Sequence, residues 1–206
     1  MIQETRIYRS FANIDRPLYL KLRMYEYVGL SRLKHPRLPK IAHSLLFVCY
    51  GNIVRSPACE ALMKRELGRF SRNDIRVASA GLNATEGRAA HPWAIAAGSE
   101  IGISLENHRA HLLTTEAVDQ ADVILAMDYQ NWVQLAARYP QVKNKLGMLG
   151  AYNRNRRSSL EIPDPYYSNQ SNTLSCYKTL EACIHNLAGT LLKRPSAGSP
   201  TLPPEP

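Results

Sequence analysis

The stretch VCYGNIVRSP, residues 48–57, decides how the rest of this 206-residue sequence is interpreted. The apolar run at residues 41–48 leads into it and is typical of a buried strand, and its final Ser-Pro pair is typical of a helix start. A strand, a short loop and a helix in succession gather backbone N–H groups around one point. Gly51 and Asn52 tolerate the left-handed backbone that turns successive amides inward. The stretch therefore predicts an anion-binding loop.

Three side chains of this loop have the chemistry to act on a bound phosphate. Cys49 lies at the base of the predicted cradle, whose positive field favours the thiolate. Arg55, six residues later, offers a planar fork that matches two phosphate oxygens. Ser56 has a hydroxyl that can donate a hydrogen bond to the thiolate. A thiolate beneath a cradled phosphate predicts nucleophilic attack on phosphorus.

Such chemistry also needs a proton donor, because a phenol leaving group with a pKa of ~10 departs slowly as an anion. Asp164 lies between two prolines in the stretch EIPDPYY, residues 161–167. The prolines stiffen the backbone on both sides of it, so a rigid loop can hold this carboxyl over the leaving oxygen. Tyr166 and Tyr167 are candidate aromatic walls for a phenyl ring.

Predicted strands and helices alternate along the body of the chain. Strands are expected at residues 41–48, 75–79, 121–127 and 145–149, and helices at 57–69, 92–101, 129–139 and 172–193. This alternation predicts an α/β fold of three layers, in which helices cover both faces of a parallel sheet. Ligands of such sheets bind beyond the carboxyl ends of the strands.

Positive charge is concentrated in the first fifth of the chain. Residues 1–40 carry +6 of the net charge of +9. Asp15 as a cap, Pro17 in a first turn and apolar residues at helical spacing favour a helix in this part over a strand. We expect three regions: a basic extension at 1–40, a body at 41–193 and a disordered Pro-rich tail at 194–206.

Composition and charge narrow the possible location and partners. No apolar run approaches the ~18 residues of a transmembrane helix, and the first residues lack the apolar core of a secretory signal. Four cysteines without a Cys-x-x-Cys pair indicate reduced thiols and a cytoplasmic protein. The basic extension is expected to contact an acidic membrane face or an acidic protein. No nucleic acid is expected, because the sequence lacks a recognised binding motif.

Taken together, these residues resemble the low-molecular-weight protein tyrosine phosphatase family. Its pattern is Val-Cys-x-Gly-Asn-x-Cys-Arg-Ser-Pro, with Asp-Pro-Tyr far along the chain. Further agreement lies in Ser79-Ala-Gly, His108-Arg-Ala and the stretches at 121–128 and 145–150. The resemblance covers residues 41–193. It implies a flavodoxin-like sheet of four parallel strands and a hydrolase that uses no metal or other cofactor.

The resemblance also implies roles for individual residues. Cys49 would be the nucleophile that forms a phosphocysteine, Arg55 the phosphate ligand, and Asp164 the general acid and then the base. Ser56 would stabilise the thiolate, and Asn52, Ser79 and His108 would hold the loop in shape. The expected substrate-binding residues are Tyr50, Gly51, Asn52, Ile53, Val54, Ser56, Tyr166 and Tyr167. The implied substrates are phosphotyrosyl proteins, with a tyrosine kinase as a candidate partner.

Other functions are open to a chain with this loop. An arsenate reductase would need shuttling thiols, for which Cys176 and Cys183 are the candidates, but the Asp-Pro-Tyr segment favours a phosphatase. A protein-arginine phosphatase is a second alternative. The arginine branch of the family resembles this pattern but has Thr after the loop Asn, where this chain has Ile53. A non-catalytic phosphate-binding adaptor is less favoured, because the nucleophile, the Arg and the acid are all present. Val54 stands where the family has a second loop cysteine that can trap an oxidised nucleophile.

Overall fold

The structure is a computed structural model that describes residues 15–28, 38–154 and 159–193. Most of the basic extension lies outside these ranges, as does the tail at 194–206 for which disorder is predicted. No helix within the described ranges combines the length and the apolar character needed to cross a membrane.

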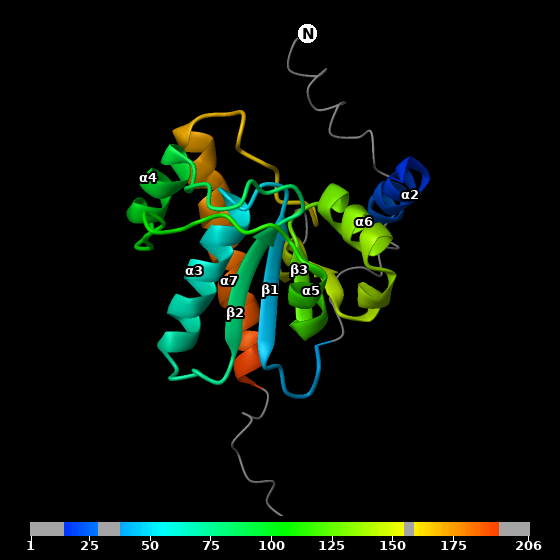
Figure 1. The fold of residues 1–206 in the computed structure, drawn as a ribbon, viewed down its shortest axis with the longest axis horizontal. Helices are drawn as coiled ribbons and strands as arrows, with labels where there is room; N and C mark the ends of the chain where they lie inside the picture. The colour runs from blue at the N-terminus through cyan, green and yellow to red at the C-terminus, as the bar shows by residue number, and fades with distance from the viewer. Residues whose placement is uncertain (1–14, 29–37, 155–158, 194–206) are drawn as a thin grey trace, which may run out of the picture.

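Four parallel strands form one sheet in the order β2-β1-β3-β4 (Figure 1). They are β1 Ser44–Cys49, β2 Arg76–Gly81, β3 Val123–Ala126 and β4 Leu146–Met148. Every residue of β1 and β3 is buried, as expected for central strands covered on both faces. Cys49 pairs with Gly81, and Val48 pairs with Ala126. The three neighbouring strands therefore end at nearly the same level, and the loop after Cys49 lies over that edge.

Helices cover both faces of the sheet. They are α2 Arg16–Tyr27, α3 Arg55–Gly68, α4 Pro92–Glu100, α5 Thr115–Gln120, α6 Tyr129–Arg138 and α7 Gln170–Leu192, with the short 3-10 helices η2 Pro140–Asn144 and η3 Leu149–Tyr152. One face carries α3, α4 and α7, and the other carries α5 and α6 with α2 outside α6 (Figure 1). The predicted three-layer, flavodoxin-like α/β fold is confirmed.

Alternate side chains of β1 pack into the hydrophobic clusters on the two faces of the sheet. Leu45, Phe47 and Cys49 belong to the cluster under α3 and α7, while Leu46 and Val48 belong to the cluster under α6. Alternate side chains of a strand point to opposite faces. The position of Cys49 in β1 therefore directs its side chain to the face from which α3 begins.

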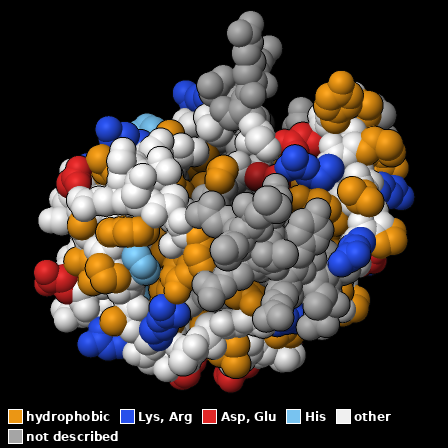
Figure 2. All heavy atoms as spheres, turned by 90° about the horizontal axis from the view of Figure 1, so that it is seen from above, with side chains coloured by type: hydrophobic (Ala, Val, Ile, Leu, Met, Phe, Trp, Pro, Cys, Tyr) orange, Lys and Arg blue, Asp and Glu red, His pale blue; other side chains and the backbone are white. Residues whose placement is uncertain are grey.

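The predicted helix of the basic extension is present as α2. Asp15 caps it by accepting a hydrogen bond from the Leu18 amide at 3.0 Å, and Pro17 lies in the first turn. Leu22 is buried in the cluster under α6. In Figure 2, hydrophobic side chains gather at the right-hand edge of the molecule, the side on which Figure 1 places α2. Leu20 and Met24 are among the exposed apolar side chains of the chain.

Among the described residues, one α-helix and the two 3-10 helices were not predicted. Residues 115–120 form α5, capped by the Thr114 hydroxyl, which accepts from the Ala117 amide at 3.1 Å. Six residues make fewer than two turns, too few for a visible apolar stripe. Only Val118 of α5 is buried. This single tertiary contact stabilises the helix, and one apolar residue gives no repeat that the sequence could reveal.

Close packing at Gly150 gives a test of the fold. A Cβ added there would overlap the Leu160 carbonyl oxygen and lie 2.7 Å from its carbonyl carbon. Backbone atoms cannot rotate away, so we expect Gly150→Ala to lower the free energy of unfolding by ~1–3 kcal/mol, measured by urea denaturation.

Gly189→Ala is the matched control. Gly189 lies on the exposed side of α7 with nothing within 4 Å of its added Cβ. Alanine in a helix interior is favoured over glycine, so this variant should gain about 0.5–1 kcal/mol. Equal stability of the two variants would contradict the close contact between η3 and Leu160.

Candidate active site

The side chain of Cys49 lies at the base of the loop that joins β1 to α3. Its Sγ is 3.0 Å from the Ser56 Oγ and accepts a hydrogen bond from the Asn52 amide at 3.3 Å. Because α3 begins at Arg55, the positive end of this helix dipole faces the same sulfur. The sulfur of Cys49 therefore lies beside a hydroxyl, a backbone amide and a helix N-terminus.

Asn52 holds the loop in shape through every polar group of its side chain. Its Nδ2 donates to the hydroxyl oxygens of Ser56 and Ser79, at 2.8 and 2.9 Å, and its Oδ1 accepts from the His111 amide at 2.8 Å. The Nε2 of His108 donates to the Asn52 carbonyl at 2.7 Å. Asn52 is fully buried with a φ of 52°, a left-handed conformation that these bonds stabilise.

Ser79 and His108 thus lie where the sequence places them, and the network extends further. The Ser79 hydroxyl donates to the Glu60 carboxylate at 2.6 Å, which fixes its direction. The Ser56 hydroxyl lies 3.4 Å from the Ala80 carbonyl oxygen. The sequence does not predict Glu60 and His111, because nothing in their local patterns indicates that the fold brings Glu60 to Ser79 and His111 to Asn52.

Arg55 connects the loop to two other segments. Its guanidinium is buried, and Nη1 donates to the Asp128 carboxylate at 2.7 Å and to the Ile162 carbonyl at 2.9 Å. Its Nη2 donates to the Asp164 carboxylate. Burial alone would lower the pKa of Arg55, but the combined charges of Asp164 and Asp128 raise it above its ordinary value. Arg55 is therefore a permanent cation at the floor of the site.

Asp128 is a functional residue that the sequence analysis missed. It follows β3, and it also caps α6 by accepting from the Asn131 amide at 2.7 Å. A buried guanidinium needs a carboxylate partner, and this requirement could have identified Asp128. Asp128 directly follows the third predicted strand, at residues 121–127, so it is an acid placed at the carboxyl edge of the sheet.

The predicted acid, Asp164, lies beside Arg55 on an exposed loop. Its side chain is 40% exposed, and its Oδ1 accepts from the Tyr166 amide at 3.1 Å. Two residues earlier, the Ile162 amide donates to the Met127 carbonyl at 2.8 Å, which ties the loop to the end of β3. The structure therefore brings the predicted acid and the phosphate-binding loop together through one guanidinium.

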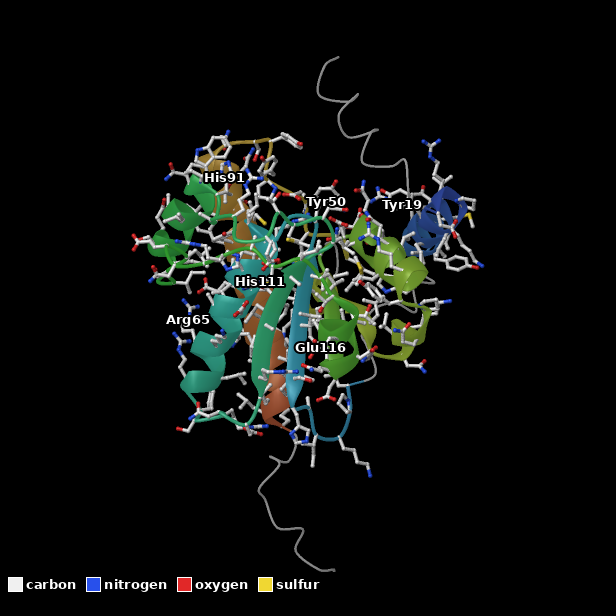
Figure 3. All side chains as sticks on the ribbon, in the orientation of Figure 1. Tyr19, Tyr50, Arg65, His91, His111 and Glu116 are labelled. Atoms are coloured by element: carbon white, nitrogen blue, oxygen red, sulfur yellow. The ribbon has the colours of Figure 1, made fainter. Side chains whose placement is uncertain are left out.

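Aromatic side chains form a wall near this loop. The Tyr166 ring lies 4.8 Å from Tyr167 and 5.4 Å from His91, measured between ring centroids. Arg88 donates to the Tyr166 hydroxyl at 3.2 Å, an interaction that, like the His91 contact, was not predicted. Figure 3 shows Tyr50 and His91 at the same end of the molecule. Tyr50 is 40% exposed, as a residue at the rim of a site must be.

Four predicted substrate-binding residues have buried side chains: Asn52 and Ser56, which belong to the hydrogen-bond network of the loop, and Ile53 and Val54. Ile53 and Val54 are 5% and 4% exposed and belong to the core cluster under α3 and α7. The Tyr177 hydroxyl of α7 donates to the Val54 carbonyl at 2.8 Å. The Ile53 and Val54 side chains therefore support the loop from below, and only their backbones, with that of Gly51, can line the cradle.

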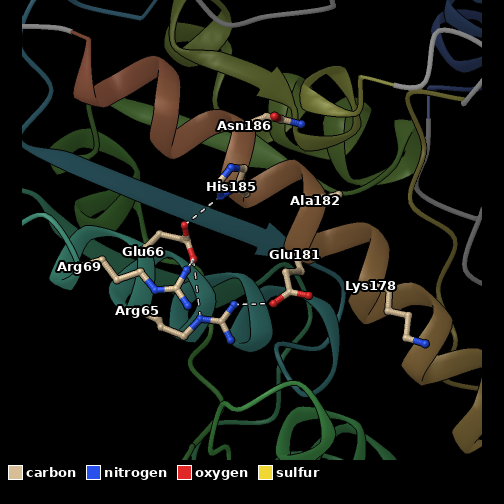
Figure 4. Close-up of a pocket in the computed structure, with 8 residues that line it drawn as sticks. All are labelled: Arg65, Glu66, Arg69, Lys178, Glu181, Ala182, His185 and Asn186. Atoms are coloured by element: carbon tan, nitrogen blue, oxygen red, sulfur yellow. Dashed lines mark hydrogen bonds and ion pairs between the residues drawn. The ribbon is translucent and has the colours of Figure 1, made fainter.

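A shallow hollow of about 470 Å³ lies beside the acid loop. Its lining includes Asp164 and Cys176 together with hydroxyl and amide side chains of α7. A second hollow of about 380 Å³ lies between α3 and α7 (Figure 4). There Arg65 pairs with Glu181 at 2.6 Å, and Arg69 pairs with Glu66 at 2.7 Å. Charge in the second hollow is largely neutralised, and Arg65 lies nearly three turns along α3 from Arg55.

A family model described as low molecular weight phosphotyrosine protein phosphatase matches residues 44–197. The chain belongs to this family. Wzb, a low molecular weight protein-tyrosine-phosphatase of Escherichia coli strain K12, is 32% identical over 149 residues, which is 72% of this chain and 95% of Wzb.

Solved structures of other family members agree with the fold. The tyrosine phosphatase amsI of Erwinia amylovora is 32% identical with a TM-score of 0.66, and the match covers 73% of this chain and 93% of amsI. The YwlE arginine phosphatase of Geobacillus stearothermophilus is 30% identical with a TM-score of 0.65, over 73% of this chain and 94% of YwlE. The prediction of a low-molecular-weight protein tyrosine phosphatase, a hydrolase, is confirmed.

Burial changes the titration of the other three thiols of this phosphatase. It raises the pKa of both Cys176 and Cys183 to about 12 and raises the pKa of Cys59 well above its ordinary value. Below these values the thiols stay protonated, so at neutral pH they are poor nucleophiles. This argues against the shuttling thiols that an arsenate reductase needs.

We therefore expect iodoacetamide at pH 7.5 to alkylate Cys49 well before Cys176, as measured by mass spectrometry of peptides at timed intervals. Exposure alone predicts the reverse, because Cys176 is 8% exposed and Cys49 only 3%. Inorganic phosphate should slow the alkylation of Cys49 and leave Cys176 unaffected. Labelling of Cys176 at the same rate as Cys49 would contradict the assignment of the reactive thiolate.

Proposed function

We propose that this phosphatase hydrolyses phosphotyrosine on proteins with Cys49 as nucleophile, Arg55 as phosphate ligand and Asp164 as general acid and base. The observation that carries this proposal is the Arg55 guanidinium, which donates to Asp164 and forms part of the loop that holds Cys49. A phosphoryl group bound over the sulfur would meet both the cation and the acid.

The first step transfers the phosphoryl group to the enzyme. The Cys49 thiolate attacks phosphorus, the bond from phosphorus to the tyrosine oxygen breaks, and Asp164 gives its proton to that oxygen. A phosphoryl dianion on the Arg55 fork competes with Asp164 for the same Nη2 and so releases the carboxyl toward the leaving oxygen. The loop amides stabilise the charge on the equatorial oxygens.

The second step regenerates the thiolate. Asp164, now a carboxylate, takes a proton from a water molecule, whose oxygen attacks phosphorus while the bond from sulfur to phosphorus breaks. The products are inorganic phosphate and the Cys49 thiolate, which the Ser56 hydroxyl stabilises at 3.0 Å. Stabilising the thiolate improves it as a leaving group in this step.

The aromatic wall favours a tyrosyl substrate, and residue 53 resembles the tyrosine branch of the family. Tyr166, Tyr167 and Tyr50 offer ring surfaces suited to a flat phenyl group. Ile53 follows the loop Asn, at the position where the arginine branch of the family has Thr. We infer that the partners are phosphotyrosyl proteins, a tyrosine kinase among them. A cytoplasmic location follows from this chemistry, since the mechanism requires a reduced cysteine.

Leaving-group dependence tests the assignment. Cys49→Ser should abolish turnover of any aryl phosphate. Asp164→Ala should lower kcat/KM for phenyl phosphate, a poor leaving group, by about 10²–10⁴-fold, and should affect 4-nitrophenyl phosphate far less. An equal loss on both substrates would remove Asp164 from the acid role, and faster hydrolysis of phosphoarginine than of phosphotyrosine would favour the arginine branch.

We also propose that the basic extension, residues 1–40, contacts an acidic membrane face. On the side of α2 turned away from α6, Leu20, Met24 and Tyr27 are 65%, 57% and 92% exposed. Arg16 and Lys21 lie at the two edges of this apolar strip when the residues are placed at helical spacing. An apolar strip edged by cations is suited to an interface with anionic lipid headgroups.

Vesicle binding by the full chain tests this contact. We expect co-sedimentation with anionic vesicles that falls with salt, is absent with zwitterionic vesicles, and drops several-fold in a Leu20→Ser/Met24→Ser variant. Phe70→Ser, which removes an exposed apolar side chain just beyond α3, is the matched control and should bind as wild type. Binding that is unchanged in the α2 variant would contradict this contact, and absence of binding by the wild type would leave an acidic protein as the partner of the extension.

A further inference from the structure

The helix α2 lies before the region matched by the family model, yet it contacts the segment that carries Asp164. On α2, the Glu26 Oε1 accepts hydrogen bonds from the Leu160 amide at 2.6 Å and from the Ser159 hydroxyl at 3.0 Å. One turn earlier, Arg23 forms an ion pair with Glu161. Three successive residues of the acid segment are thus bonded to one face of α2.

Apolar packing seats α2 against the same region. Leu22 and Leu160 are 6% and 8% exposed and belong to one hydrophobic cluster, which also includes residues of α6. On its other side, Leu160 is in close contact with Gly150. The start of the acid segment is therefore enclosed between α2 and η3, and α2 supplies both its polar and its apolar contacts on one side.

The chain between Leu160 and Asp164 has little freedom to absorb a displacement. The Glu161 carboxylate accepts from the Tyr129 amide at 3.1 Å, and Ile162 is held by Met127 and Arg55. Pro163 and the proline after Asp164 fix their own φ angles. A shift of Leu160 is therefore transmitted along a short, stiff segment to the Asp164 carboxyl.

We propose that α2 is a brace that positions the general acid, with Glu26 and Arg23 as its positioning residues. This inference rests on the proposed role of Asp164. A general acid must lie within hydrogen-bonding distance of the leaving oxygen, and small displacements from such a geometry reduce rates steeply. Glu26 and Arg23 act only through the segment at 159–161 and do not contact substrate.

A helix that merely covers α6 would behave differently. Loss of its contacts would lower the free energy of unfolding and affect all substrates alike. Loss of a brace impairs proton donation, so it lowers kcat/KM more as the leaving group becomes poorer. The dependence of kcat/KM on the leaving group therefore separates the two roles, because kcat/KM reports the steps up to departure of that group.

The experiment compares phenyl phosphate with 4-nitrophenyl phosphate in variants of the full chain. Glu26→Ala should lower kcat/KM for phenyl phosphate by about 10-fold and for 4-nitrophenyl phosphate by less than about 2-fold. Glu26→Gln keeps an acceptor oxygen and should recover most of the loss. Arg23→Met should show a smaller effect of the same kind. Tyr25→Phe, on the same helix but without a contact to the acid segment that the structure records, should match wild type.

A double-mutant cycle with Asp164→Asn completes the test. In that background Glu26→Ala should change kcat/KM for either substrate by less than about 2-fold, because the group that it positions is gone. Thermal denaturation identifies a variant that fails to fold, and Glu26→Gln then provides the test. The proposal would be overturned if Glu26→Ala lowered kcat/KM equally for both substrates. It would also be overturned if Glu26→Ala lowered kcat/KM as much in the Asp164→Asn background as in the wild type.

Failure of this proposal is distinct from failure of the proposed function. If Asp164→Asn alone shows no dependence on the leaving group, the acid assignment fails and the brace fails with it. If Asp164→Asn shows that dependence and Glu26→Ala does not, the brace alone fails.

Discussion

The buried guanidinium of Arg55 is the interaction on which the site depends. A cation removed from water is stable only if its charge is matched. Here the partners of Nη1 and Nη2 come from different parts of the chain: Asp128 after β3, and the Ile162 carbonyl and Asp164 on the acid loop. Meeting this requirement brings the acid loop to the edge of the sheet at which β1 ends. The need to neutralise one buried charge thus assembles a site from segments that lie 73 to 109 residues from Arg55 in the chain.

The shape of the phosphate-binding loop depends on the hydrogen bonds of one side chain. Its left-handed residue, Asn52, would be tolerated as Gly on backbone grounds alone, but only an amide side chain can both donate to Ser56 and Ser79 and accept from the His111 backbone. The side chain therefore ties together α3, β2 and the segment between α4 and α5. A preorganised cradle of this kind needs little rearrangement when a phosphoryl group arrives.

Much of this architecture could be predicted from the sequence because it is local. The strand, loop and helix around Cys49, the stiff Pro-Asp-Pro segment and the alternation of strands and helices are patterns within short windows. Asp128, Glu60 and the contacts of Glu26 could not be predicted, because each depends on a partner brought near by the fold. The helix α2 has one feature of each kind. Its cap at Asp15 could be predicted from the sequence, whereas its contact with Leu160 could not.

The hydroxyl of Ser56 has a consequence of its own. Because Asn52 donates to its oxygen, Ser56 has one proton for two acceptors, the sulfur of Cys49 at 3.0 Å and the Ala80 carbonyl at 3.4 Å. It can serve only one of them at a time. A thiolate attracts the proton strongly, whereas a sulfur bonded to phosphorus no longer does, and the carbonyl then becomes the better acceptor. The direction of a single O–H bond therefore follows the charge on the sulfur through each turnover.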